Sequence, residues 1–92
     1  MYKVTLKKQF RKDFALMKRR GMPLDELQTA ITVLASGSTL APEYRDPPLK
    51  GEYVGCRECH ILPDWLLVYK IKDRMLELIL IRTGSHSDLF KK

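Results

Sequence analysis

The chain has 92 residues, 45% of them hydrophobic and 30% charged, and a formal net charge of +6 at pH 7. These values are typical of one folded domain with a single small core, and they argue against several domains or a disordered chain. No apolar run is long enough to cross a bilayer, and the N-terminal stretch lacks the apolar segment of a secretory signal. We therefore expect a cytoplasmic protein with no membrane segment, in which the two cysteines are reduced thiols.

Basic residues are concentrated at the start of the chain. The first twenty positions hold eight lysines and arginines and a single acid, Asp13. Such clustering on one element favours binding of a polyanion, which would be nucleic acid, a membrane surface or an acidic protein. The alternative, that the charge only keeps the protein soluble, would predict a more even distribution.

The N-terminal half is predicted to form a short strand and two helices. Residues 2–6 alternate between apolar and polar positions, as in a strand. A helix is then expected to run to Gly21, with an apolar face made of Leu6, Phe10, Phe14 and Met17. The rest of its surface carries the basic residues Lys7, Lys8, Arg11, Lys12, Lys18 and Arg19. Pro23 opens a second amphipathic helix that ends at Ser36, so the two helices form a hairpin.

The C-terminal half is predicted to form three antiparallel strands. Residues 36–51 contain three prolines and two glycines and are expected to be a loop. Strands are expected at residues 53–62, 65–71 and 75–82, with turns between them and a polar tail after them. The predicted fold is a single α+β domain over residues 1–92, with the N-terminal strand and the helical hairpin packed on one face of a small antiparallel sheet. The other face is left free for a ligand.

Two histidines, an aspartate and an arginine are expected to meet at one edge of this sheet. The four residues lie near strand ends, which come together in an antiparallel meander; they are His60, Asp64, Arg82 and His86. In RNA cleavage, a base takes the proton of the ribose 2′-hydroxyl, an acid protonates the leaving 5′-oxygen, and a fixed cation stabilises the charged phosphate. These side chains supply all three functions. Trp65 and Phe90 are candidates for stacking on RNA bases.

Each of these residues also has a simpler interpretation. A histidine in a strand is more often an ordinary surface or core residue than a catalyst. Arg82 can pair with Glu77 or Asp64, and Trp65 and Phe90 can be core residues. The catalytic interpretation is favoured because the candidates occur together with a basic helix and an open sheet face.

A competing motif lies next to the first histidine. Residues 56–60 read Cys-Arg-Glu-Cys-His, which fits the C-x-x-C-H pattern of haem attachment and resembles half of a zinc site. Haem attachment takes place outside the cytoplasm, and residues three apart on a strand point to opposite faces. No second C-x-x-C pair completes a zinc site. We therefore expect two small buried apolar side chains, with no metal and no cofactor.

Four segments resemble the YafQ branch of the RelE/ParE toxin superfamily. They are Pro48–Gly51, Gly55–His60, Pro63–Lys70 and Arg82–Phe90. The matching pattern spans about half of the chain, from Pro48 to Phe90, and the helical N-terminal half agrees in layout. The resemblance implies a RelE-like microbial ribonuclease fold. It also implies a toxin of a type II toxin–antitoxin system that cleaves messenger RNA on the ribosome without a metal ion.

The same resemblance implies roles for the individual residues. His86 would be the general acid, and Asp64 or His60 the base or orienting group. Arg82 would hold the scissile phosphate, and Phe90 would stack on a base, with Trp65 beside them. The basic residues of the first helix would grip ribosomal RNA. The partner would be an acidic antitoxin, expected to bind DNA and to form a hetero-oligomer with the toxin.

One position departs from the family, and two other functions compete with this one. Family members often carry a histidine where this chain has Pro47; either the remaining groups suffice, or cleavage is slower or differs in specificity, or the toxin is weakened. A ParE-like toxin that poisons a protein such as DNA gyrase is the main alternative, although it has no chemical need for the histidine cluster. A basic DNA-binding module is disfavoured because the sequence shows no convincing recognition helix.

Overall fold

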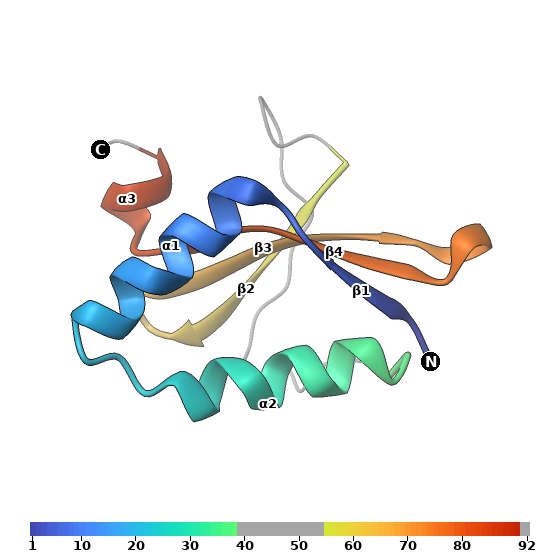
Figure 1. The fold of residues 1–92 in the computed structure, drawn as a ribbon, viewed down its shortest axis with the longest axis horizontal. Helices are drawn as coiled ribbons and strands as arrows, with labels where there is room; N and C mark the ends of the chain where they lie inside the picture. The colour runs from blue at the N-terminus through green and yellow to red at the C-terminus, as the bar shows by residue number, and fades with distance from the viewer. Residues whose placement is uncertain (39–54, 91–92) are drawn as a thin grey trace.

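The computed structural model describes residues 1–38 and 55–90. Figure 1 shows the order of the elements in these ranges: β1 (Lys3–Leu6), α1 (Lys8–Arg19), α2 (Leu24–Ala35), β2 (Arg57–Leu62), β3 (Trp65–Lys72), the 3-10 turn η3 (Asp73–Met75), β4 (Glu77–Gly84) and α3 (His86–Phe90). No helix in the described part of the chain is long and apolar enough to span a membrane. The predicted loop at residues 36–51 lies mostly outside the described residues, as does Pro47.

The four strands form one sheet in the order β1-β4-β3-β2. The three C-terminal strands are antiparallel, as predicted. β1, however, pairs with β4 in parallel, with Lys3 opposite Glu77 and Leu6 opposite Leu80. The sheet is therefore mixed. The N-terminal strand was expected to pack with the hairpin on one face of an antiparallel sheet, but it is an edge strand of the sheet itself and runs parallel to β4. A pattern of alternating residues predicts a strand, but it does not specify the direction of its neighbour.

The helical hairpin covers one face of the sheet, which confirms the predicted α+β layers. α2 buries Leu27, Ala30 and Leu34, and α1 contributes Phe10 and Met17 to the same core. The sheet contributes alternate residues of its strands to this core: Cys59, Ile61, Trp65, Leu67, Tyr69, Leu78 and Leu80. This layer of apolar side chains supplies the main hydrophobic stabilisation of the domain.

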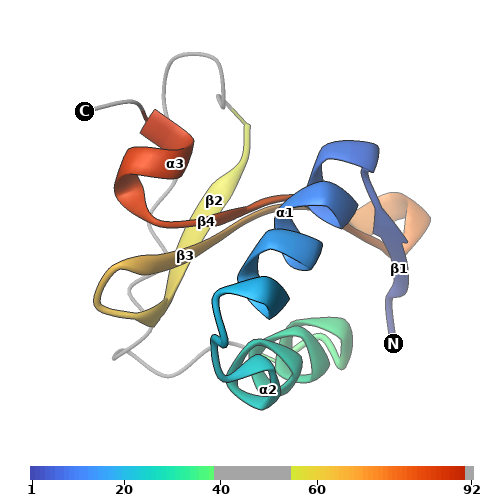
Figure 2. The ribbon, with the colours of Figure 1, turned by 60° about the vertical axis from the view of Figure 1, so that its left-hand side comes forward.

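The opposite face of the sheet is partly covered by α3. Leu66 and Val68 of β3 point away from the hairpin and pack against Leu89. β3 is thus apolar on both faces, which explains its nearly continuous hydrophobic sequence. Figure 2 shows α2 and α3 on opposite sides of the sheet. The polar tail with Leu89 and Phe90 that was expected after the third C-terminal strand forms the short helix α3, in which Leu89 is an apolar anchor.

Two strand boundaries also differ from the prediction. β2 begins at Arg57, because Gly55 lies in a turn with a φ of 87°, in the left-handed region that glycine favours. β4 begins at Glu77, because the turn before it consists of η3 and Leu76. Leu76 has a φ of 48°, which is not a strand conformation. The register is also interrupted by a bulge between Val68 and Tyr69. This bulge decides which face the last residues of β4 occupy.

Candidate active site

Hydrogen bonds fix the start of α3 in place. The backbone N–H of Ser85 donates to Oδ2 of Asp88 at 2.8 Å, and the N–H of Asp88 donates to Oγ of Ser85 at 3.1 Å. These two bonds form a reciprocal cap on the first turn of the helix. Arg20, at the end of α1, donates to both oxygens of the same carboxylate at 2.7 and 3.1 Å. His86, the first residue of α3, therefore has a defined position relative to both α1 and β4.

Asp64 and His86 form a close pair. Asp64 lies in the turn between β2 and β3, and its Oδ1 is 2.6 Å from Nδ1 of His86 and accepts the backbone N–H of His86 at 3.0 Å. Both hydrogen bonds from His86 hold the pKa of the Asp64 carboxyl below its usual range. The bond from the backbone N–H has the larger effect, and the bond from the ring has the next largest. Because a carboxylate only accepts hydrogen bonds, it favours a proton on Nδ1. Nε2 is then the ring atom that can exchange a proton with a substrate.

The second histidine and an aromatic ring lie beside this pair. The ring centroids of His60 and His86 are 5.6 Å apart, and those of His86 and Phe90 are 6.5 Å apart. The register explains the approach of the histidines: His60 is opposite Leu66, which is opposite Gly84 at the end of β4. Two imidazoles, a carboxylate and an aromatic ring are thus gathered at one end of the sheet. Such a group can transfer protons in both directions during a phosphodiester cleavage.

Arg82 shares the face of this cluster, but its partner was not foreseen. Arg82 lies opposite Val68, which lies opposite Glu58, so these three side chains are on the same face of the sheet. His60 is two residues after Glu58 on β2 and therefore shares this face. With strands about 4.8 Å apart and a rise of about 3.4 Å per residue, the Cα atoms of His60 and Arg82 are roughly 12 Å apart. The guanidinium binds Asp13 of α1, with Nε to Oδ2 at 2.7 Å and Nη2 to Oδ1 at 3.2 Å. The sequence had suggested Glu77 or Asp64 as its partner.

Trp65 is a core residue in this structure. Its side chain has no accessible surface, lies on the face of the sheet that the hairpin covers, and donates its Nε1–H to Oγ1 of Thr83 at 2.8 Å. A side chain in this position does not offer a ring for stacking on RNA. The core interpretation therefore applies to Trp65, and the stacking role stays a prediction for Phe90, which is partly exposed.

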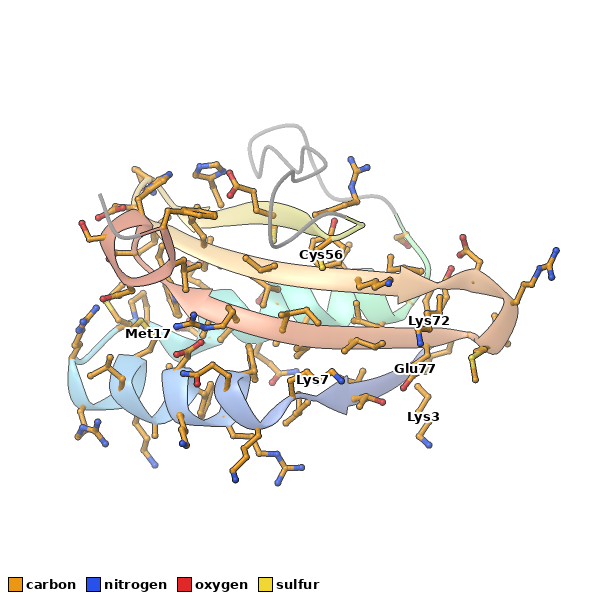
Figure 3. All side chains as sticks on the ribbon, turned by 90° about the horizontal axis from the view of Figure 1, so that it is seen from above. Lys3, Lys7, Met17, Cys56, Lys72 and Glu77 are labelled. Atoms are coloured by element: carbon orange, nitrogen blue, oxygen red, sulfur yellow. The ribbon has the colours of Figure 1, made fainter. Side chains whose placement is uncertain are left out.

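The six predicted basic contacts are all exposed. Five of them lie on α1: Lys8, Arg11, Lys12, Lys18 and Arg19. The sixth, Lys7, lies between β1 and α1 and is labelled in Figure 3. The acid in this stretch, Asp13, is instead buried against the sheet. α1 thus presents its positive charge to the outside. This arrangement fits a polyanion-binding face.

The prediction of two buried cysteines is confirmed for Cys59 but not for Cys56, which precedes β2 and is only partly buried. Cys59 is fully buried in the core on the hairpin side, whereas Cys56 packs against the apolar cluster of α3 on the opposite side. Both are free thiols. Among residues 1–38 and 55–90, no three His, Cys, Asp or Glu side chains are grouped as a metal site.

Sequence reasoning missed the residues that hold the candidate site in place. Asp13 was noted only as an isolated acid, yet it is three residues after Phe10 and four before Met17, which places it on the buried face of α1. Ser85 and Asp88 have the three-residue spacing of a capping box, a signal that would have predicted α3. The pairing of Arg20 with Asp88 has no sequence signal, since these residues are 68 positions apart.

Comparisons with known proteins agree with this architecture. Residues 2–91 match the family model of YafQ, a bacterial toxin of type II toxin–antitoxin systems. The mRNA interferase toxin YafQ of Escherichia coli is 37% identical over 83 residues, which are 89% of this chain and 88% of that protein.

Solved structures show the same fold. A crystal structure of a metal-bound toxin from Helicobacter pylori has a TM-score of 0.91 and 44% identity, covering 98% of this chain and all of that one. The E. coli DinJ–YafQ complex contains a chain with a TM-score of 0.89 and 34% identity, covering 98% of this chain and 99% of that one. The chain described here therefore belongs to the YafQ family of bacterial toxins of type II toxin–antitoxin systems.

Proposed function

We propose that this chain is an endoribonuclease that cleaves messenger RNA, with His60, Asp64, Arg82 and His86 as its catalytic residues. The observation that carries the proposal is the Asp64–His86 pair, with a second imidazole 5.6 Å from the first. The mRNA interferase name of the E. coli relative supports the same activity. A toxin that acts only by binding a protein has no need for such a proton-transfer group.

The geometry suggests a division of roles. In its protonated form, His86 would donate a proton to the leaving 5′-oxygen, while Asp64 orients the ring and stabilises its charge. His60 would accept the proton of the 2′-hydroxyl as that oxygen attacks phosphorus, forming a cyclic phosphate. Arg82 would stabilise the charge on the phosphate. Phe90, whose ring lies 6.5 Å from that of His86, would stack on a neighbouring base.

Mapping of message ends in cells tests this proposal. Induced expression of the wild type should produce new 5′ ends in messenger RNA, and His86→Ala should abolish them. Asp73→Asn is a matched control, because Asp73 is also a hydrogen-bonded carboxylate but lies in the turn between β3 and β4. In a purified reaction, cleavage should be unchanged by a chelator that is selective for transition metals and leaves the Mg²⁺ of the ribosome in place. Growth arrest without new ends would reject the nuclease and favour the gyrase-type alternative.

We further propose that cleavage takes place on the ribosome, through the exposed basic face of α1. Replacing Lys7, Lys8 and Arg11 with glutamine should weaken ribosome binding and make it less dependent on salt. The slope of the logarithm of the binding constant against the logarithm of the salt concentration should become shallower by about 0.7–0.9 for each phosphate contact that is lost.

A control that removes three equal charges elsewhere is available. Lys3, Lys72 and Arg74 are exposed, and Figure 3 shows Lys3 and Lys72 at the end of the sheet far from α3. Their glutamine variants should retain binding. An equal effect of the two triple variants would show that only net charge matters and would refute a specific α1 contact.

We also propose that the toxin acts in the cytoplasm and is silenced there by an acidic, DNA-binding antitoxin. An apolar groove of about 420 Å³ runs beside the basic face of α1, with Val4, Leu6, Phe14 and Arg11 among its lining residues. Three of these apolar side chains are between 37% and 40% exposed. Such a groove suits an amphipathic segment with acidic residues beside its apolar face. Phe14→Gln, which adds no charge to α1, should weaken antitoxin binding and leave cleavage intact; unchanged antitoxin affinity would exclude this groove.

A further inference from the structure

Asp13 occupies an unusual position for a carboxylate. Its side chain is only 8% exposed on a helix whose other charged residues face outward. It accepts four hydrogen bonds: two from Arg82, one from the backbone N–H of Thr83 at 3.2 Å, and one from Nε2 of Gln9 at 3.1 Å. Burial of a carboxylate is costly unless such donors compensate for it. Every donor except Gln9 comes from the end of β4 that leads into α3.

The sheet explains why α1 reaches Arg82 at this point. β1 pairs only with residues 77–80 of β4, so the following residues of β4 have no strand beside them on that side. α1 continues the chain from β1 and packs against β4, as Figure 2 shows. Asp13 therefore takes the place of a strand neighbour: it accepts the N–H of Thr83 and, with its two oxygens, fixes the plane of the Arg82 guanidinium.

We propose that Asp13 is a positioning residue for RNA cleavage, which holds the guanidinium of Arg82 in the orientation that stabilises the charged phosphate. This inference rests on the proposed function. The carboxylate is not expected to touch RNA, and its negative charge opposes binding of a phosphate nearby. Its benefit is orientation, because a displacement of about 1 Å of a catalytic group can reduce the rate by as much as 100-fold.

The opposing effects of charge and orientation give a distinctive kinetic signature. Asp13→Asn should lower kcat by about 10- to 100-fold, while KM stays equal or falls, because the region around Arg82 becomes more positive. A purely structural role would instead reduce the amount of folded protein and lower kcat in proportion to that amount. Asp13→Glu, which restores the carboxylate one methylene further out, should recover part of kcat. Asp73→Asn serves as the control and should leave kcat unchanged.

A double-mutant cycle with Arg82→Gln tests whether Asp13 acts through the arginine. In the Arg82→Gln background, Asp13→Asn should cause no further loss of kcat per folded molecule. An equal loss in both backgrounds, or an unchanged kcat in Asp13→Asn, would overturn the inference. If Asp13→Asn does not fold, Asp13→Glu in the two backgrounds decides the same question. Absence of RNA cleavage by the wild type would overturn the proposed function itself, which separates the two failures.

Discussion

Replacing Trp65 with phenylalanine should destabilise the protein and leave its chemistry intact. The indole is fully buried and donates a hydrogen bond to Thr83 at 2.8 Å. Loss of the second ring leaves a partial cavity that costs about 1–2 kcal/mol, and loss of the buried hydrogen bond costs about 1 kcal/mol more. The sum of about 2–3 kcal/mol should lower the Tm by roughly 10–20 °C in a domain of this size. Denaturant unfolding and the cleavage rate per folded molecule measure the two effects separately.

A second variant removes the acceptor of this hydrogen bond. Thr83→Val keeps the shape of the side chain, but it removes two bonds: the one that Oγ1 accepts from the indole N–H, and the one that Oγ1 donates to the carbonyl of Leu66 at 2.7 Å. The buried indole N–H left without its partner should by itself cost about 1–3 kcal/mol. The double variant should cost less than the sum of the two single variants, because both remove the same bond. A Trp65→Phe protein with wild-type stability and greatly reduced cleavage would refute this reasoning. It would restore the stacking role that the sequence suggested.

Two further predictions concern the docking of α3. Asp88 has a pKa held well below its usual range by Arg20, so its stabilising effect is present above the unfolded pKa of about 3.9 and is lost as the pH falls toward the folded value. The wild type should therefore be more stable than Asp88→Asn at pH 7, and this difference should shrink below pH 4. Thermal unfolding of both proteins from pH 2 to 7 measures the difference. Curves of Tm against pH that stay parallel for the two proteins would contradict the prediction. Gly84→Ala would place a Cβ 2.9 Å from that of Asp88, which should cost about 1–3 kcal/mol and slow cleavage by displacing His86. Wild-type values in unfolding and cleavage assays would exclude this contact.

Local periodicity in the sequence was sufficient for the main elements. Apolar spacing of three and four residues gave both helices, since these spacings follow from the 3.6 residues of a helical turn. The apolar run of β3 predicted a strand in the middle of the C-terminal meander, and the structure places it between β2 and β4. The motif segments also placed His60, Asp64 and His86 near strand ends that proved to be neighbours. These features depend on residues close together in the chain, so the sequence carries them directly.

Other features depend on how distant segments meet, and only the tertiary structure decided them. The bulge at Val68 and Tyr69 shifts the register of β4 by one residue, which puts Arg82 on the face of His60 and Thr83 on the face of Trp65. A shift of one residue exchanges the two faces of a strand, and no local pattern specified it. The partner of Arg82 lies 69 positions away on α1. The sequence by itself therefore supplied the candidate groups for the chemistry, whereas long-range packing determined their orientation, because contacts between distant residues are set by the topology of the whole sheet.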